Sequence, residues 1–146
     1  RGAIGDYSVR LSTQGEDGRA GDQAVTVLQF SAQNLGAPAA SVAPAPPVDR
    51  PVGNARVNVP LVVTATDPDG VENLAVVFAR DPESGAVIGL LADDGEDDDE
   101  EEGDGVYTEA LSVTSDFEPG TYAVEVVAVD RYGAESDPAP FTFTVR

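Results

Sequence analysis

The sequence contains no cysteine, histidine, methionine, tryptophan or lysine, and these absences exclude several classes of function. Without cysteine there is no disulfide and no thiolate nucleophile. Without histidine as well, the usual zinc and haem ligands and the Ser-His-Asp triad are missing. The eight basic residues are all arginines and stand against 27 acidic residues, so the formal net charge at pH 7 is −19. Repulsion between this charge and phosphate groups argues against nucleic acid as a partner.

The chain also lacks an initiating methionine and any long apolar run. It begins with Arg1, so we expect a processed protein or a fragment of a longer one. No apolar stretch approaches the roughly 18 residues that a membrane-spanning helix needs, and no membrane insertion is expected. Processing, the missing cysteine and repeated β-strand patterns together predict an extracellular or cell-surface location.

Hydrophobic residues make up 41% of the 146 residues, which is enough for one core with an appendage. Composition divides the chain into three regions. Residues 1–35 hold two strand-like runs on either side of a glycine-rich polar turn. Residues 36–53 carry five prolines, which favours an extended linker or strap, and residues 54–146 read as a β-domain.

The β-domain is predicted from short runs in which apolar and polar residues alternate, with turn signals between them. No stretch of useful length shows the 3.6-residue period of a helix. An all-β, antiparallel β-sandwich accounts for this pattern best. The expected strands are residues 57–66, 72–80, 86–92, 106–114, 121–129 and 140–146.

Three segments of this domain, residues 61–70, 103–108 and 119–130, resemble bacterial and archaeal extracellular immunoglobulin-like modules of the fibronectin-III-like and cadherin-like kinds. The resemblance covers residues 54–146 and implies an immunoglobulin-like β-sandwich that works at a cell surface. Tyr122 sits where such domains place a tyrosine corner. The core tryptophan and the disulfide of antibody-type domains are absent, which excludes that subclass.

Residues 93–104 form an acidic stretch in which ten of twelve residues are Asp or Glu. In a sandwich, alternate connections fall at the same end, so this stretch is expected at one pole with the connections near residues 67–70 and 130–137. Ca²⁺ prefers carboxylate and carbonyl oxygens on loops. The sequence therefore suggests a calcium site with ligands among Asp67, Asp69, Asp93, Asp94, Asp104 and Asp130.

The high negative charge is also compatible with two interpretations that involve no calcium. The acidic stretch is accounted for equally well as a solvated loop with diffuse counterions. Without residues 93–104 the chain still has 17 acidic against 8 basic residues, a net charge of −9, which is typical of a salt-adapted or highly soluble surface. This background does not account for the clustering of the acids.

The N-terminal runs, residues 6–12 and 23–33, allow two arrangements. They form a hairpin within the chain, or one of them adds as a donor strand to the sheet of a neighbouring subunit. Repeated strand addition would build a homo-oligomer or an open filament. The residues expected at such a subunit contact are Tyr7, Val9, Leu11, Val25, Val27 and Phe30.

No catalytic constellation is recognisable, so we do not expect an enzyme. The hypothesis from the sequence is an extracellular structural subunit of a cell-surface assembly, such as a pilus-like filament, joined by strand addition between subunits. The alternative is a monomeric surface adhesion or carbohydrate-binding module stabilised by calcium. In that case Tyr132, placed between the last two strands, would stack against a sugar ring.

Overall fold

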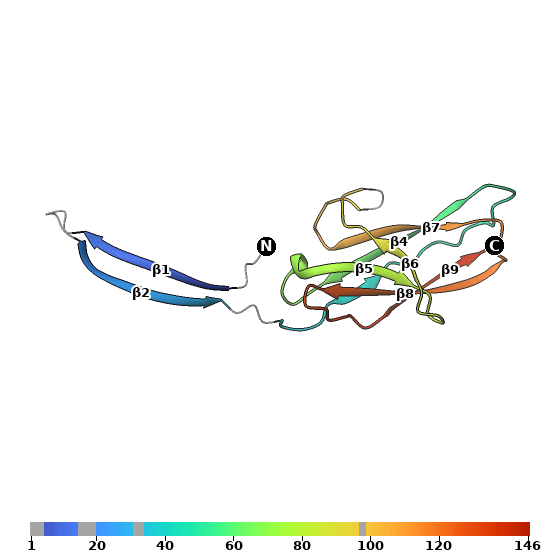
Figure 1. Cartoon of the computed structure of the whole chain (residues 1–146). Helices are drawn as coiled ribbons and strands as arrows, with labels where there is room; N and C mark the ends of the chain where they lie inside the picture. The colour runs from blue at the N-terminus through green and yellow to red at the C-terminus, as the bar shows by residue number, and fades with distance from the viewer. Residues whose placement is uncertain (1–4, 15–19, 31–33, 97–98) are drawn as a thin grey trace. The chain divides into compact units, whose positions relative to one another are not determined.

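A computed structural model describes residues 5–14, 20–30, 34–96 and 99–146 (Figure 1). The chain divides into two compact units, Arg1–Asn34 and Leu35–Arg146. Within the first unit, the strands are described through their backbone pairing.

The first unit is a two-stranded antiparallel sheet made of β1 (Gly5–Gln14) and β2 (Ala20–Phe30). Pairing runs from Gly5 opposite Phe30 to Ser12 opposite Gln23. The register then shifts by one residue, so that Gln14 lies opposite Ala20. The two runs therefore pair with each other within the chain. Residues 31–33 of the predicted second run lie outside the described residues.

The second unit is an immunoglobulin-like β-sandwich of two antiparallel sheets, which confirms the predicted fold class. One sheet has the strand order β3-β4-β7 and the other β6-β5-β8-β9. The elements are β3 (Ala39–Val42), β4 (Val57–Thr66), η1 (Val71–Asn73), β5 (Leu74–Arg80), β6 (Val87–Leu91), β7 (Val106–Val113), β8 (Gly120–Asp130) and β9 (Ala139–Val145).

The core forms because alternate residues of each strand face the opposite sheet. On β4, Val59, Leu61 and Val63 are fully buried, and the residues between them are at least partly exposed. The same alternation on β9 buries Phe141 and Phe143. The remaining core is built mostly from valine and alanine, and its other main members are Ala65, Leu74, Val77, Ala79, Leu91, Val113, Val124, Val126, Ala128, Ala139 and Val145.

The proline-rich segment differs from the predicted linker. Residues 39–42 form β3, which pairs with β4, and the sandwich begins at Leu35 rather than at residue 54. Proline is tolerated at a sheet edge, where a missing N–H costs no ladder hydrogen bond. The four residues of β3 contain no proline, so the prolines on either side bound a short edge strand. The proline-rich composition of residues 36–53 predicted a linker and gave no indication of this strand.

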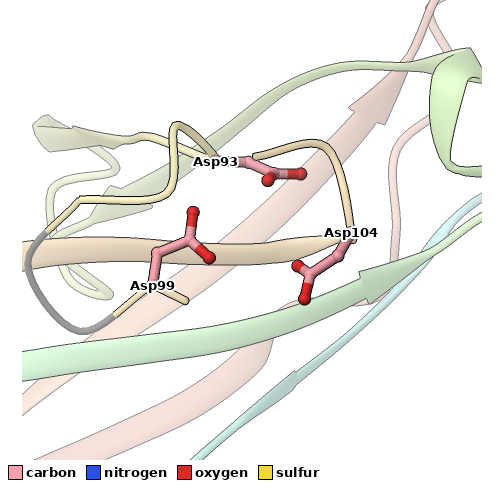
Figure 2. A group of neighbouring side chains, drawn as sticks. All are labelled: Asp93, Asp99 and Asp104. Carbon is pink, nitrogen blue, oxygen red and sulfur yellow. The ribbon is translucent and has the colours of Figure 1, made fainter. Parts of the chain in front are cut away.

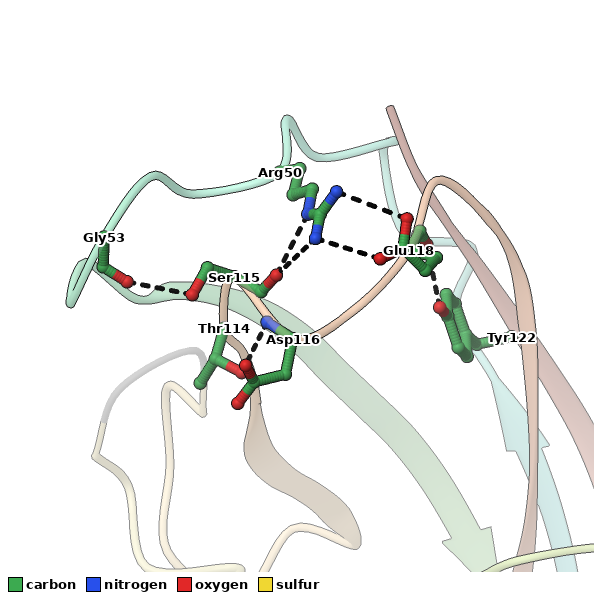
Figure 3. A network of polar contacts seen from close by, with 7 residues as sticks. All are labelled: Arg50, Gly53, Thr114, Ser115, Asp116, Glu118 and Tyr122. Atoms are coloured by element: carbon green, nitrogen blue, oxygen red, sulfur yellow. Dashed lines mark hydrogen bonds and ion pairs between the residues drawn. The ribbon is translucent and has the colours of Figure 1, made fainter.

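The end of the sandwich that carries the C-terminus is tied together by Arg50 and Tyr122 (Figure 3). The Arg50 guanidinium donates to the Ser115 carbonyl at 3.0 and 2.6 Å and to the Glu118 carboxylate at 3.3 and 3.1 Å. The Tyr122 hydroxyl donates to the Glu118 carbonyl at 2.7 Å, which is the tyrosine corner expected from the sequence. Residues 50–53, 114–119 and 146 are called the carboxyl-terminal pole below.

The chain enters the sandwich at the opposite end. The Leu35 N–H donates to Asp69 Oδ2 at 2.8 Å, so the first residue of the unit lies beside the loop between β4 and β5. Figure 1 shows that β9 runs from that end towards the C-terminus. The first and last residues of the sandwich therefore lie at opposite poles.

Candidate cation site at the acidic pole

Three loops meet where the chain enters the sandwich, as the alternate-connection argument predicted. The Ala65 N–H donates to the Gly105 carbonyl at 2.8 Å, which joins the first two loops. The Arg131 N–H donates to the Asn73 carbonyl at 2.9 Å and brings in the third. The loops are residues 67–73, 93–105 and 130–138, and together they are called the acidic pole.

The acidic loop closes on itself at its base. Ala92 and Thr108 exchange two backbone hydrogen bonds of 3.0 and 2.7 Å. Above them, the Asp93 carboxylate accepts from the N–H groups of Gly103 at 2.5 Å and Gly105 at 3.0 Å. Gly105 has a φ of 89°, and a Cβ there would stand 2.8 Å from the Ala65 carbonyl oxygen, so this position requires glycine. The base of the loop is therefore well determined.

Three aspartates gather inside the loop: Asp93, Asp99 and Asp104 (Figure 2). One carboxylate oxygen from each lies within 4.8 Å of the other two. Asp99 is only 4% exposed, and its carboxylate accepts from the N–H groups of Gly95 at 2.8 Å and Glu101 at 3.3 Å. Asp104 is exposed and accepts from its neighbour Val106 at 2.8 Å. We call these three residues the aspartate trio.

The trio places like charges close together. At a separation of 4–5 Å, two carboxylates repel by about 1 kcal/mol in bulk water and by about 4 kcal/mol at an effective dielectric constant near 20. The backbone N–H groups offset part of this cost. A hard divalent cation would offset more, because carboxylate oxygens on a glycine-containing loop are the ligands that Ca²⁺ prefers. Within the described ranges, this trio is the group whose geometry fits a metal ion.

The sequence identified two members of the trio, Asp93 and Asp104, and missed Asp99. No signal in the sequence separates Asp99 from its acidic neighbours, because only the folded loop buries it. Asp94, which was predicted as a ligand, lies outside the trio and accepts from the Glu96 N–H at 3.1 Å.

The other three predicted ligands structure the neighbouring loops. Asp67 Oδ1 accepts from Asp69 N–H at 2.8 Å and from Asn73 Nδ2 at 3.1 Å, while Asp69 binds Leu35 N–H. Asp130 is 2% exposed and accepts from the N–H groups of Tyr132 and Ala134, both at 2.8 Å. The structure does not bring these three residues into the trio.

Asp67 has a second feature of interest. Its Oδ2 atom is buried and is the buried side-chain polar atom that lacks a hydrogen-bond partner within the part of the chain that the structure describes. Leaving a buried charged acceptor unsatisfied is costly. A hydrogen-bond donor or a cation bound at the acidic pole would satisfy the Oδ2 atom of Asp67.

The pKa of Tyr107, at the start of β7, is affected by its burial and by the charge of Asp93. Burial of the phenol, and then the negative charge of Asp93, raise the pKa of Tyr107 above its usual value. The neutral phenol is thus favoured in the folded state. Its contribution to stability is present below the unfolded pKa of about 10 and is lost as the pH rises through the folded value.

We expect Asp93→Asn to lower the pKa of Tyr107, because it removes one of the two causes. Asp94→Asn is the matched control and should leave that pKa unchanged. NMR titration of the tyrosine ring carbons separates Tyr107 from the other three tyrosines. An unchanged Tyr107 titration in Asp93→Asn would contradict the proximity of these two groups.

No helix within the described residues is long and apolar enough to cross a membrane.

Comparison with known proteins finds likeness at the level of structure. No protein-family model matches the chain, and no curated protein matches its sequence. A solved structure described as fibronectin(III)-like modules of Clostridium thermocellum CbhA matches at 23% sequence identity and a TM-score of 0.48. The match covers 99% of this chain, which spans 64% of the length of that one.

Proposed function

We propose that the sandwich is a non-catalytic, load-bearing spacer in an extracellular or cell-surface assembly, and that it transmits tension from the acidic pole to the carboxyl-terminal pole. The observation that carries this proposal is a backbone ladder between residues 48–50, which follow β3, and residues 144–146 at the end of the sandwich. Both segments run in the same direction between the poles, and only β3 and its flanking residues lie between the start of the sandwich and the ladder.

The ladder contains three backbone hydrogen bonds. The Val48 N–H donates to the Thr144 carbonyl at 2.9 Å, and the Arg146 N–H donates to the Val48 carbonyl at 2.9 Å. The Arg50 N–H donates to the Arg146 carbonyl at 2.7 Å. Val48 and Val145 form a parallel bridge, so the two segments lie side by side with the same polarity.

This geometry decides how a load is shared. A pull on Leu35 and Arg146 loads the pairing of β3 with β4 and draws residues 48–50 past residues 144–146. The force then acts across all three hydrogen bonds at once, and none can break far ahead of the others. In a hairpin pulled open from its free ends, the bonds would break one after another at lower force. A parallel ladder between the entering and leaving segments is therefore suited to resisting tension.

The test is force spectroscopy on Val48→Pro, which removes the N–H that binds Thr144. Asp49→Pro is the matched control, because the ladder uses the N–H groups of residues 48 and 50. A backbone hydrogen bond is worth about 1 kcal/mol net, so the unfolding rate of Val48→Pro under constant force should rise about fivefold or more. Equal rates in the two variants would overturn the load-bearing proposal.

We also propose that Ca²⁺ binds the aspartate trio and holds the acidic loop closed. The three carboxylates would supply part of the six to eight oxygens that the ion takes, with backbone carbonyls and water completing the shell. Extracellular calcium modules bind with dissociation constants of about 10⁻⁴–10⁻³ M. An affinity in this range would suit a structural ion in a calcium-rich extracellular compartment.

Assembly into a filament by strand addition is a separate proposal. Because β1 and β2 pair with each other, a donor strand would first have to leave this hairpin. The register also puts Tyr7, Val9, Leu11 and Phe30 on one face and Val25 and Val27 on the other, so the six predicted contact residues do not form one surface. Removal of residues 1–34 tests this proposal, because sedimentation of a truncated chain that still polymerises would rule it out.

A ligand-binding role is the second candidate, favoured by one cavity. A cavity of about 500 Å³ is lined by Ile88, Leu111, Phe117 and Tyr122, and Asp81 and Glu109 are also among its lining residues. Aromatic rings beside carboxylates are suited to sugar rings. Tyr132, which the sequence analysis assigned to sugar stacking, is 46% exposed but does not line this cavity. A glycan array separates this role from a purely mechanical one.

A further inference from the structure

The hairpin of β1 and β2 forms a sheet of its own. Within the described residues, neither strand pairs with any strand of the sandwich. A two-stranded hairpin in water is marginally stable unless something covers one of its faces. The sandwich itself has both of its sheets complete without these strands. The hairpin therefore needs a partner of its own.

The pairing register of this hairpin is repeated at the other end of the chain. Gly5 pairs with Phe30, and Gly120 pairs with Val145. Gly120 follows Gly5 by 115 positions, and Val145 follows Phe30 by the same 115. Every further pair down to Leu11 opposite Ala24 has its counterpart at the same spacing, ending with Val126 opposite Ala139.

The irregularity in the pairing is repeated as well. In the N-terminal hairpin the register shifts by one residue, and Gln14 then lies opposite Ala20. In the sandwich, Val129 forms a bridge with Glu135 beyond the last regular pair of β8 and β9. These two pairs are again separated by 115 positions. The strands differ in length, but the matching register and the matching register shift indicate that the two hairpins are copies of one unit.

The residue pattern agrees with the register. On β8 and β9, one face carries Tyr122, Val124 and Val126 with the paired residues Phe143, Phe141 and Ala139, and this face packs into the core. The equivalent positions on β1 and β2 are Tyr7, Val9 and Leu11 with Leu28, Thr26 and Ala24. Six residue types are unchanged between the copies in the sequence, at positions 5, 7, 9, 18, 22 and 24.

The second copy shows what such a hairpin packs against. The outer edge of β8 pairs with β5, the edge of β9 meets Val48, and the apolar face is covered by the sheet of β3, β4 and β7. These partners all precede the hairpin in the chain. The first copy has the corresponding edges, and the corresponding face carries apolar residue types at each of its positions from 7 to 11 and from 24 to 28 except Thr26.

We propose that β1 and β2 are the closing hairpin of a second sandwich of the same fold. The partner is a set of strands equivalent to β3–β7, supplied by residues upstream of the hairpin in the same polypeptide. The protein is then a tandem array with a repeat of 115 residues, and the described sandwich follows its predecessor directly. This inference rests on the pairing register and does not depend on the load-bearing proposal.

The test supplies the missing strands. Residues 35–119 are placed ahead of Gly5, so that Pro119 joins Gly5 as it joins Gly120 in the sandwich. Amide hydrogen exchange of residues 5–30 is then compared between this lengthened chain and the 146-residue chain. We expect exchange to slow by about a thousandfold or more, because the hairpin becomes part of a cooperative core.

Two variants of the lengthened chain sharpen the result. Val9→Asp with Leu11→Asp alters positions equivalent to the buried Val124 and Val126, so it should abolish the new protection and leave residues 35–146 unchanged. Thr26→Phe with Leu28→Phe restores the residues found at positions 141 and 143, which removes any mismatch with the supplied strands. Fast exchange of residues 5–30 in both the lengthened chain and this restored version overturns the proposal.

The 146-residue chain gives the remaining outcomes. The proposal expects weak protection of residues 5–30 at every protein concentration. Protection that increases with concentration, together with a dimer in sedimentation, would identify a second copy of the chain as the partner and overturn the proposal. Strong protection that is independent of concentration would identify packing within the chain, with the same consequence.

Discussion

Phe143→Ala is expected to lower the free energy of unfolding of the sandwich by about 3–5 kcal/mol. The Phe143 side chain is 6% exposed, and its ring centroid lies 5.4 Å from that of Tyr122, 6.2 Å from that of Phe141 and 6.5 Å from that of Phe117. Truncation removes this aromatic packing and leaves a cavity between the sheets. Denaturant titration followed by tyrosine fluorescence measures the loss.

Leu28→Ala is the matched control, since Leu28 occupies the equivalent position in the N-terminal hairpin. Because residues 1–34 form a separate unit, we expect Leu28→Ala to change the unfolding of residues 35–146 by less than about 0.5 kcal/mol. A comparable loss of stability in both variants would show that the hairpin is part of the same cooperative unit. That result would contradict the division of the chain described above.

Removing calcium is expected to have the next largest effect. At a Ca²⁺ concentration one hundred times the dissociation constant, binding to the folded state alone stabilises it by about 2.7 kcal/mol. For a sandwich of this size, that corresponds to a melting temperature about 10 °C higher with Ca²⁺ than with excess EDTA. Thermal unfolding followed by circular dichroism in the two conditions measures the difference.

The variant that isolates the aspartate trio is Asp99→Asn, and Asp94→Asn is its control in the same loop. Asp99→Asn should reduce the calcium-dependent difference in melting temperature to a small fraction of its value. Asp94→Asn should retain that difference, because its carboxylate lies outside the trio. The calcium-dependent difference is the decisive quantity, since Asp99 also accepts two backbone hydrogen bonds in the loop. A wild-type melting temperature that EDTA leaves unchanged would contradict the calcium proposal.

The sandwich strands were predictable because their residues alternate so regularly. The predicted strand over residues 57–66 coincides with β4, and the one over 106–114 differs from β7 by a single residue. Valine and threonine at alternating positions give a period of two that no helix would satisfy. The tyrosine corner was also predictable, because Tyr122 follows a Pro-Gly turn at the start of a strand.

Two features were hidden from the sequence for physical reasons. The strand β3 lies between prolines, and a proline-rich segment usually indicates a linker. A strand can lie so close to prolines because it is at a sheet edge, where a missing N–H breaks no hydrogen bond between strands. Asp99 is one of ten acidic residues in one stretch, and it is buried only in the folded loop, where its carboxylate accepts from the N–H groups of Gly95 and Glu101. In both cases the contact partners are distant or loop residues that only the folded chain brings together, so the sequence pattern alone does not reveal them.

The repeat between the two hairpins was present in the sequence but too weak to stand alone. The Gly-x-Tyr-x-Val pattern occurs at residues 5–9 and again at residues 120–124. Six matching positions are compatible with chance similarity between any two amphipathic hairpins. The identical register and the identical shift turned the pattern into a specific inference.

The most direct test of the load-bearing role compares two pulling axes on the same sandwich. The chain has no cysteine, so pairs of introduced cysteines provide unique attachment points. Leu35→Cys with Arg146→Cys loads the ladder between residues 48–50 and 144–146 in shear. Asp116→Cys with Arg146→Cys opens β8 from β9 at the carboxyl-terminal pole, one pair at a time. We predict a several-fold higher unfolding force along the first axis, and an equal or lower force there would contradict the proposed function.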